Sequence, residues 1–240
     1  MRALSRSTWS FPSLVSLALV GVALAGCTRK AQPEPSAEPI TPAAAPLNAV
    51  KPESGPATAN AKVGAPAPDF TLIDLEGKQI TLSSFRGKTV VLEWFNPGCP
   101  FVKASHTKGS LVDAAERHRK AGVVWLAINS GAPGKQGHGV DVNRESQQRF
   151  KLEHPILLDE TGRVGRVYAA AHTPHLYVID KEGVLVYRGA IDNSPDGEGE
   201  SPTGGRLINY VDAALSDITA GRPVGTAETE AYGCSVKYGS

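Results

Sequence analysis

The segment TVVLEWFNPGCP, residues 89–100, is the most informative part of the chain. Residues 89–95 form a near-continuous apolar run, the pattern of a strand that is buried on both faces. The turn-forming residues of 96–98 follow, and Pro100 is a favoured first residue of a helix. The segment therefore predicts a buried strand, a tight turn and a helix that begins beside Cys99.

The predicted position of Cys99 bears on its chemistry. The free amides and the positive end of a helix dipole favour a thiolate over a thiol. A thiolate is the nucleophile both in peroxide reduction and in thiol–disulfide exchange. A free cysteine is also often a buried structural residue, so position alone leaves both roles open.

The patterns around this segment predict an α/β domain. Alternating strands and helices of this kind favour a mixed central sheet with helices on both faces, to which an N-terminal hairpin is added. The expected strands are 70–73, 79–82, 89–95, 123–128, 156–158, 176–179 and 184–187. The expected helices are 100–120 with a break near 109, 143–152, 164–171 and 207–220, besides one helical turn that starts at Ser83.

The N-terminus has the features of an export signal. Residues 1–26 carry two arginines and no acidic residue, and the apolar run 14–25 is shorter than the roughly 20 residues of a membrane-spanning helix. The run ends in Leu24-Ala25-Gly26-Cys27, which resembles the lipobox of bacterial lipoproteins. We therefore expect a signal peptide, a lipid on Cys27 and a location at the periplasmic side of a membrane, with Thr28 favouring the outer membrane. An ordinary secretory signal with a chance cysteine is the alternative.

The rest of the chain divides into three segments. Residues 27–62 hold Cys27 and a stretch in which Pro and Ala fill 16 of 35 positions, which predicts a disordered tether. Regular patterns then predict one folded domain over 63–222. Residues 223–240 form a C-terminal tail that carries Cys234.

Composition excludes several classes of function. Lys and Arg total 25 against 24 Asp and Glu, so no excess charge attracts nucleic acid. Three widely spaced cysteines exclude a disulfide framework and a multi-cysteine zinc site, and we expect no cofactor. If Cys27 carries a lipid, Cys99 and Cys234 remain, which is the number a redox pair needs.

The order of these features resembles the thioredoxin-like fold. A strand, a cysteine at a helix start and Thr173-Pro174 before a later strand are its marks. The resemblance implies that Thr173 and Pro174 form the cis-proline loop that faces the reactive cysteine. It also places Glu93, six residues before Cys99, where thioredoxins have the buried acid that accepts and returns the cysteine proton. A strand carboxylate with an ordinary structural role is the alternative for Glu93.

Residues 63–240 resemble more closely the redoxin group of alkyl hydroperoxide reductase, thiol-specific antioxidant proteins and peroxiredoxins. The opening VGAPAPDF, residues 63–70, is similar to the start of that group. Four further segments resemble one peroxiredoxin-like subfamily. They are GCPFVK (98–103), TPH (173–175), YRGAID (187–192) and YGCSVKY (232–238). The resemblance implies a thiol-dependent oxidoreductase that reduces a small peroxide or an oxidised thiol at Cys99 and is reset by a thiol reductant.

The sequence departs from these families at two positions. Thioredoxins have a second cysteine where this chain has Val102, so their local disulfide cannot form. Typical peroxiredoxins have threonine where this chain has Asn96, whose amide can still donate a hydrogen bond to a peroxide oxygen. Peroxiredoxins also need an arginine near the thiolate, and the candidates are Arg149, Arg163 and Arg166.

The role of Cys234 is open at this stage. It can fold back on Cys99 as a resolving thiol that condenses with a sulfenic acid, or it can form a static structural disulfide. Two rivals to peroxide reduction also remain. One is thiol–disulfide exchange with a protein partner. The other is a non-catalytic protein that binds thiols, or binds copper through Cys99 and His172.

Overall fold

The computed structural model of the protein describes residues 60–202 and 204–240. The predicted signal peptide, the lipid-bearing Cys27 and nearly all of the predicted tether lie outside the described residues. Ala61 is already buried, and its amide donates a hydrogen bond to the Val167 carbonyl, so the packed domain includes the last residues assigned to the tether. Within the described ranges, no helix has the length and apolar character needed to cross a membrane.

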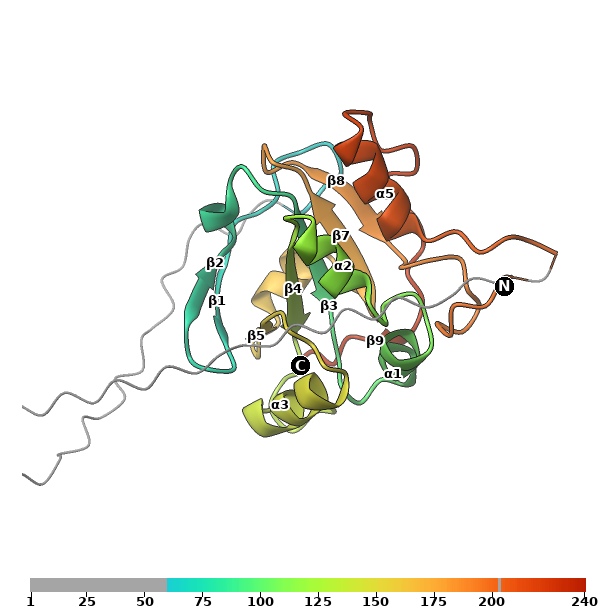
Figure 1. Ribbon diagram of the computed structural model, residues 1–240. Helices are drawn as coiled ribbons and strands as arrows, with labels where there is room; N and C mark the ends of the chain where they lie inside the picture. The colour runs from blue at the N-terminus through green and yellow to red at the C-terminus, as the bar shows by residue number, and fades with distance from the viewer. Residues whose placement is uncertain (1–59, 203) are drawn as a thin grey trace, which may run out of the picture. The chain divides into compact units, whose positions relative to one another are not determined.

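A mixed sheet forms the centre of the domain, and its seven strands within the described residues lie in the order β2-β1-β5-β4-β3-β7-β8 (Figure 1). The central strands β3, β4 and β5 are parallel, and the outer pairs are antiparallel. The predicted N-terminal hairpin is β1 with β2, and it extends the sheet because β1 pairs with β5. The strands are β1 Thr71–Asp74, β2 Gln79–Thr81, β3 Val90–Trp94, β4 Val124–Asn129, β5 Ile156–Leu158, β7 His175–Ile179 and β8 Leu185–Gly189.

The helices of the described residues agree with the predicted ones in number and order. They are α1 Pro100–Thr107, α2 Ala114–Lys120, α3 Val140–Arg149, α4 Arg163–Val167 and α5 Tyr210–Thr219, besides the 3-10 turn η1 Leu82–Phe85. The predicted break near Gly109 is confirmed. Residue 109 is glycine because the chain passes close to it there: a Cβ on Gly109 would lie 2.1 Å from the carbonyl oxygen of Gly197.

Three predicted helix boundaries are wrong. The last helix begins at Tyr210 rather than at 207, because the Asn209 side chain caps it by accepting a hydrogen bond from the Asp212 amide. The helix predicted at 143–152 begins and ends three residues earlier. The helix predicted at 164–171 ends at Val167, and Ala169 then adopts a positive φ of 52°.

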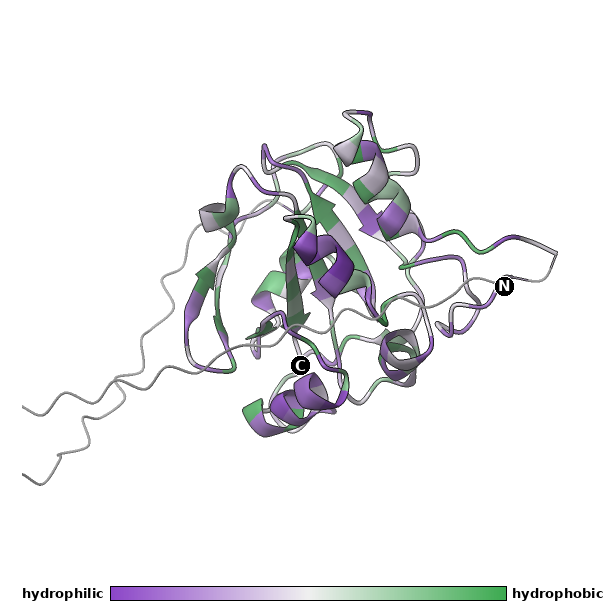
Figure 2. Cartoon of the chain, viewed as in Figure 1, coloured by the Kyte–Doolittle hydropathy of each residue, from purple (hydrophilic) through white to green (hydrophobic). Residues whose placement is uncertain are grey.

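Strand β3 is buried on both faces, as its apolar run predicts. Side chains alternate along a strand, so successive residues belong to different cores. Val91 packs in the core that includes residues of α2 and α5, whereas Leu92 packs in the core that includes residues of η1 and α4. Helices therefore cover both faces of the sheet, and Figure 2 shows apolar strands between helices that carry hydrophilic stretches.

The C-terminal tail belongs to the folded domain. Its strand β9, Cys234–Ser235, pairs with β6, His172–Thr173, in a small second sheet that the sequence did not predict. The tail is held on either side of β9: before it, the Tyr232 hydroxyl donates a hydrogen bond to Asp192, and after it, the Tyr238 hydroxyl donates one to the Ala170 carbonyl. This pairing brings the tail to the edge of the main sheet where α1 begins.

Candidate active site

Cys99 lies where the sequence predicts it, between β3 and α1. It is the N-cap residue of α1, and Pro100 is the first helical residue. The turn before it is closed by Asn96, whose side-chain oxygen accepts a hydrogen bond from the Gly98 amide at 2.9 Å. The Cys99 side chain has no exposed surface. Cys99 therefore lies at the start of a helix, and its sulfur is buried under other parts of the chain.

Cys234 lies directly against Cys99. The two sulfur atoms are 2.7 Å apart and belong to free cysteines, although 135 residues separate them in the chain. A disulfide bond is about 2.05 Å long, so a small movement of either side chain would allow the bond to form. The predicted return of the tail to Cys99 is therefore what the structure has.

The Thr173–Pro174 peptide bond is cis, as the thioredoxin-like resemblance implies. The Cys99 thiol donates a hydrogen bond to the Thr173 carbonyl at 3.0 Å. Thr173 also pairs with Cys234 in the β6–β9 ladder. The segment before β7 therefore contacts both cysteines and fixes their relative position.

Glycine at position 233 allows this pairing to be close. Gly233 has a φ of 115°, a conformation that side chains with a Cβ rarely adopt. A Cβ there would lie 2.3 Å from the Thr173 carbonyl oxygen. Residue 233 must therefore be glycine for Cys234 to approach Cys99 along this path.

The surroundings of Cys234 keep it protonated at neutral pH. Burial and the hydrogen-bonded contact with Cys99 raise the pKa of the Cys234 thiol to about 11. The amide of Phe101 and the ammonium group of Lys237 oppose this shift by favouring the thiolate. The amide of the second residue of α1 is thus directed at Cys234, an arrangement that the sequence did not indicate.

Glu93 is fully buried behind the site, and two side chains form hydrogen bonds with its carboxylate. His106 on α1 contacts one oxygen at 2.7 Å through Nε2, and the Trp125 indole donates to the other at 3.1 Å. Burial raises the pKa of Glu93, but the interactions with His106, His154 and Trp125 together outweigh this, so the pKa lies below its ordinary value. Among the described residues, the hydrogen bonds of this carboxylate go to His106 and Trp125, with none to Cys99.

The buried cluster contains a second histidine. His154 is 1% exposed, and its Nε2 has no hydrogen-bond partner among the described residues. Burial lowers its pKa to about 4, which Glu93 opposes and His106 reinforces. Sequence reasoning missed both histidines. The available signal for His106 was its spacing, since seven residues after Cys99 is two helical turns and thus the same helix face.

Asn96 is buried beside the glycine-rich loop that follows β4. Its amide donates to the Gln136 side chain at 3.3 Å, and a Cβ on Gly98 would meet that same side chain at 2.5 Å. Two side chains hold the loop in place, because Asn129 and Asn143 both donate a hydrogen bond to the Gly137 carbonyl. The loop therefore forms one edge of the site.

Two of the three candidate arginines have other partners. Arg149 pairs with Glu145, and Arg166 lies 4.7 Å from the Tyr238 ring and donates to the Gly239 carbonyl. No hydrogen bond from Arg149, Arg163 or Arg166 to either sulfur occurs within the described residues.

The copper hypothesis names Cys99 and His172 as ligands, and His172 lies in β6. Within residues 60–202 and 204–240, no three His, Cys, Asp or Glu side chains are grouped so that they could hold a metal ion. His175 hydrogen bonds to the Tyr177 hydroxyl, and burial lowers its pKa to about 3.

The chain has relatives among named proteins. It is 35% identical over 123 residues to the thiol-disulfide oxidoreductase ResA of Geobacillus thermodenitrificans, a match that covers 50% of this chain and 65% of that protein. It is 33% identical over 135 residues to the chloroplastic peroxiredoxin Q of Arabidopsis thaliana, covering 51% of this chain and 56% of the relative. In both cases the chain spans less than two thirds of the relative's own length.

Among solved structures, a hypothetical protein from Sinorhizobium meliloti 1021 superposes with a TM-score of 0.64 at 27% identity. The superposition covers 75% of this chain and 97% of that one. Residues 63–188 match the AhpC/TSA family, which leaves Cys234 outside the matched range. The strand, helix and cis-proline loop that surround Cys99 all lie inside it. The chain belongs to the AhpC/TSA family.

Proposed function

We propose that the protein is a two-cysteine thiol oxidoreductase whose Cys99 and Cys234 alternate between a dithiol and a disulfide. The observation that carries the proposal is the 2.7 Å separation of the two sulfur atoms. The family supports redox chemistry at Cys99, and the relative named thiol-disulfide oxidoreductase supports an oxidised thiol as substrate. In this reaction a substrate disulfide is reduced to two thiols, and the two cysteines lose two electrons and become joined.

A peroxide is the second candidate substrate, because the relative named peroxiredoxin Q also matches. The Cys99 thiolate would attack one peroxide oxygen and become a sulfenic acid, and the Cys234 thiol would displace water to form the disulfide. One observation favours the oxidised thiol. The Asn96 side chain that replaces threonine is already hydrogen bonded to Gly98 and Gln136, so it is not free to bind a peroxide oxygen.

The remaining predicted residues have supporting roles in the proposal. Thr173 and the cis Pro174 form the wall against which the disulfide closes, since the Thr173 carbonyl accepts the Cys99 hydrogen bond. Glu93 acts on protons through His106 rather than by touching Cys99.

The location proposed is the periplasmic side of a membrane, with a lipid on Cys27. The lipobox-like residues 24–27 and the proline-rich stretch after them support it. Cys27→Ser should move the protein from the membrane pellet to the soluble fraction of the cell envelope. A variant that stays in the pellet would exclude the lipid anchor.

Trapping the disulfide tests the function. The Cys27→Ser protein is reduced, mixed with one equivalent of either oxidised glutathione or hydrogen peroxide, quenched with an alkylating agent at intervals, and mapped by mass. We expect a Cys99–Cys234 bridge with both oxidants, and faster formation with oxidised glutathione. Cys99→Ser and Cys234→Ser are the matched controls that cannot form it. If neither oxidant joins the two cysteines, the proposal is wrong.

A further inference from the structure

A groove opens beside the first half of β4. Among the described residues, β5 pairs with β4 at Ala127–Asn129 alone, although β4 begins at Val124. The β1–β2 hairpin joins the sheet through β5, so it does not close the space beside the start of β4. The groove lies between this hairpin and the connection from α2 to β4 (Figure 1), and its volume is about 530 Å³. Sites that bind small molecules have volumes of about 300–1,000 Å³.

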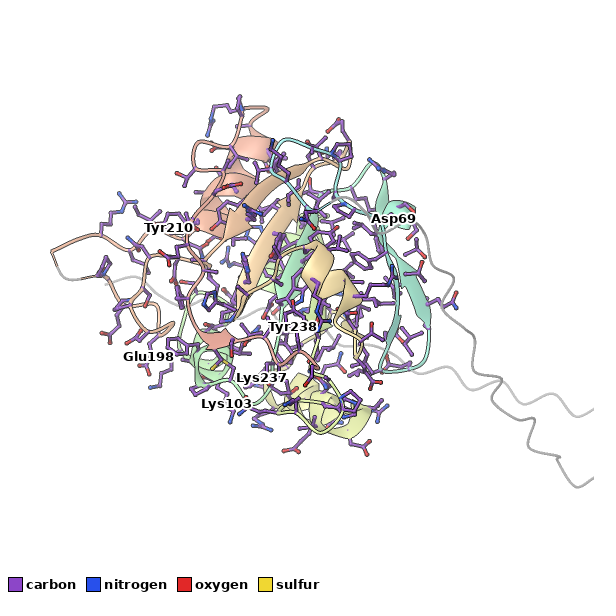
Figure 3. All side chains as sticks on the ribbon, turned by 180° about the vertical axis from the view of Figure 1, so that it is seen from behind. Asp69, Lys103, Glu198, Tyr210, Lys237 and Tyr238 are labelled. Atoms are coloured by element: carbon purple, nitrogen blue, oxygen red, sulfur yellow. The ribbon has the colours of Figure 1, made fainter. Side chains whose placement is uncertain are left out.

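The groove is separate from the pair of cysteines. Cys99 follows the end of β3, and β3 runs parallel to β4, so Cys99 and Val124 lie at opposite ends of these strands. Lys103 of α1 and Lys237 of the tail lie toward the bottom of Figure 3, at the end of the sheet where Cys99 is. The redox chemistry proposed above therefore gives the groove no role.

The walls of the groove are apolar. Ile80 of β2 and Phe85 of η1 line it from one part of the chain, and Val123 and Val124 line it from another. All four side chains are only partly buried, and each packs against one of the two main cores. A hydrocarbon chain in the groove would cover these side chains and remove them from water, which is favourable.

Two ion pairs lie along the same groove. Arg119 of α2 pairs with Glu153 at 3.2 Å, and Lys120 of α2 pairs with Glu116. The two acidic side chains that line the groove are therefore each balanced by a basic side chain of the same lining.

Lys78 and Lys88 also line the groove, and they carry positive charge that no acid balances. Both side chains are exposed, and neither forms an ion pair among the described residues. The lining thus has four basic side chains against two acidic ones. An anion bound beside the two lysines would meet complementary charge.

We propose that this groove binds a single-chain anionic amphiphile, a long-chain carboxylate of the fatty-acid type. Its hydrocarbon chain lies on the apolar walls, and its carboxylate lies at Lys78 and Lys88. A small polar anion would leave the apolar walls in water, and a neutral hydrocarbon would leave the lysines without a counter-charge. A ligand with both parts satisfies both features of the groove.

Titration calorimetry on the Cys27→Ser protein tests the class of ligand. The probes are octanoate, decanoate and neutral decanol, each kept below the concentration at which it forms micelles or separates from water. We expect decanoate to bind at one site per chain. A buried CH₂ group changes an affinity about fourfold, so two further CH₂ groups, partly covered in an open groove, should make decanoate bind about tenfold more tightly than octanoate.

Three results would overturn the proposal. Absence of saturable decanoate binding would refute the site. Equal affinity for octanoate and decanoate would mean that the groove recognises charge alone. Binding of triglutamate as tight as that of decanoate would identify an acidic peptide as the occupant instead.

A variant that combines Lys78→Gln with Lys88→Gln tests the position of the carboxylate. The attraction between opposite unit charges about 4 Å apart in water corresponds to about a fivefold change in affinity. The variant should therefore bind decanoate at least about fivefold more weakly at low salt and should bind decanol as before. Lys135→Gln is the control, because Lys135 is exposed in the loop after β4 and does not line the groove. Unchanged affinity for decanoate, or an equal loss with decanol, would contradict the assignment.

Ile80→Glu tests the position of the hydrocarbon chain. A carboxylate on the apolar wall should weaken decanoate binding at least about tenfold, because it would be desolvated by the chain and would repel the headgroup. Ile73→Glu carries the same change of charge on the neighbouring strand β1, where Ile73 is 47% exposed and does not line the groove. Urea unfolding checks that both variants fold. Equal affinities of the two variants for decanoate would refute this placement, and the lysine variant remains a test if Ile80→Glu does not fold.

Discussion

Replacing Cys234 by serine in the Cys27→Ser protein tests how far the bridge to Cys99 stabilises the domain. The two cysteines are 135 residues apart in the chain. In the chain-entropy treatment, closing a loop of this length removes enough freedom from the unfolded state to add roughly 5 kcal/mol to the free energy of unfolding. Because the sulfur atoms already lie 2.7 Å apart, the native state needs little rearrangement to form the bond.

The assay is urea unfolding of the oxidised protein, the reduced protein and the Cys234→Ser variant. The oxidised protein should exceed the reduced protein by roughly 5 kcal/mol, and its melting temperature should be about 10–20 °C higher for a domain of this size. The variant should match the reduced protein and should not respond to reductant.

The same quantity is measured independently by the thiol–disulfide equilibrium. If the bridge stabilises the fold by about 5 kcal/mol, folding must favour the bridge over two thiols by a factor of about 4,000. Equilibration with glutathione, with and without urea, gives this factor directly. The reasoning is refuted if a mapped Cys99–Cys234 bridge adds less than about 1 kcal/mol, since the tail would then not fold together with the rest of the domain.

Two further predictions concern single residues. Gly233→Ala should slow formation of the bridge more than about tenfold, because the new Cβ would lie 2.3 Å from the Thr173 carbonyl oxygen and the positive φ costs about 1–2 kcal/mol. Gly77→Ala is the control, because Gly77 also has a positive φ of 80° but a Cβ there would have no atom within 4 Å. If alkylation shows that the bridge forms at the same rate in both variants, the prediction is contradicted. Burial lowers the pKa of His154 to about 4 from an ordinary 6.5. As the pH falls, the unfolded chain therefore takes up the His154 proton before the folded protein does. The free energy of unfolding should decrease from pH 6.5 toward pH 4 by up to about 3 kcal/mol. His154→Phe should lose that part of the pH dependence in urea unfolding, and identical pH profiles for the two proteins would exclude it.

The sequence alone determined the local features around Cys99. The apolar run 89–95, the turn at 96–98 and the proline after Cys99 each act within a few residues, so they predict a buried strand, a turn and a helix start. The cis peptide bond before Pro174 followed from the resemblance of the sequence order to a known fold.

Boundaries and side-chain caps were less predictable. The last helix starts at Tyr210 because the Asn209 side chain accepts the Asp212 amide hydrogen, a contact that apolar periodicity does not report. The pairing of β6 with β9 was missed for a related reason, because each strand has only two residues and neither has a periodic pattern.

The tertiary structure decided which groups meet at the site. The contact between Cys234 and Cys99 depends on where a segment 135 residues away is fastened, and Gly233 and the β6–β9 ladder fasten it. The partners of Glu93 come from α1 and β4, two elements that follow it in the chain. Periodicity and turn signals describe neighbours in sequence, whereas burial and contact between distant segments arise only when the chain packs. For this reason the sequence predicted which cysteine is reactive, and the fold determined that Cys99 is buried and that Cys234 is partly accessible.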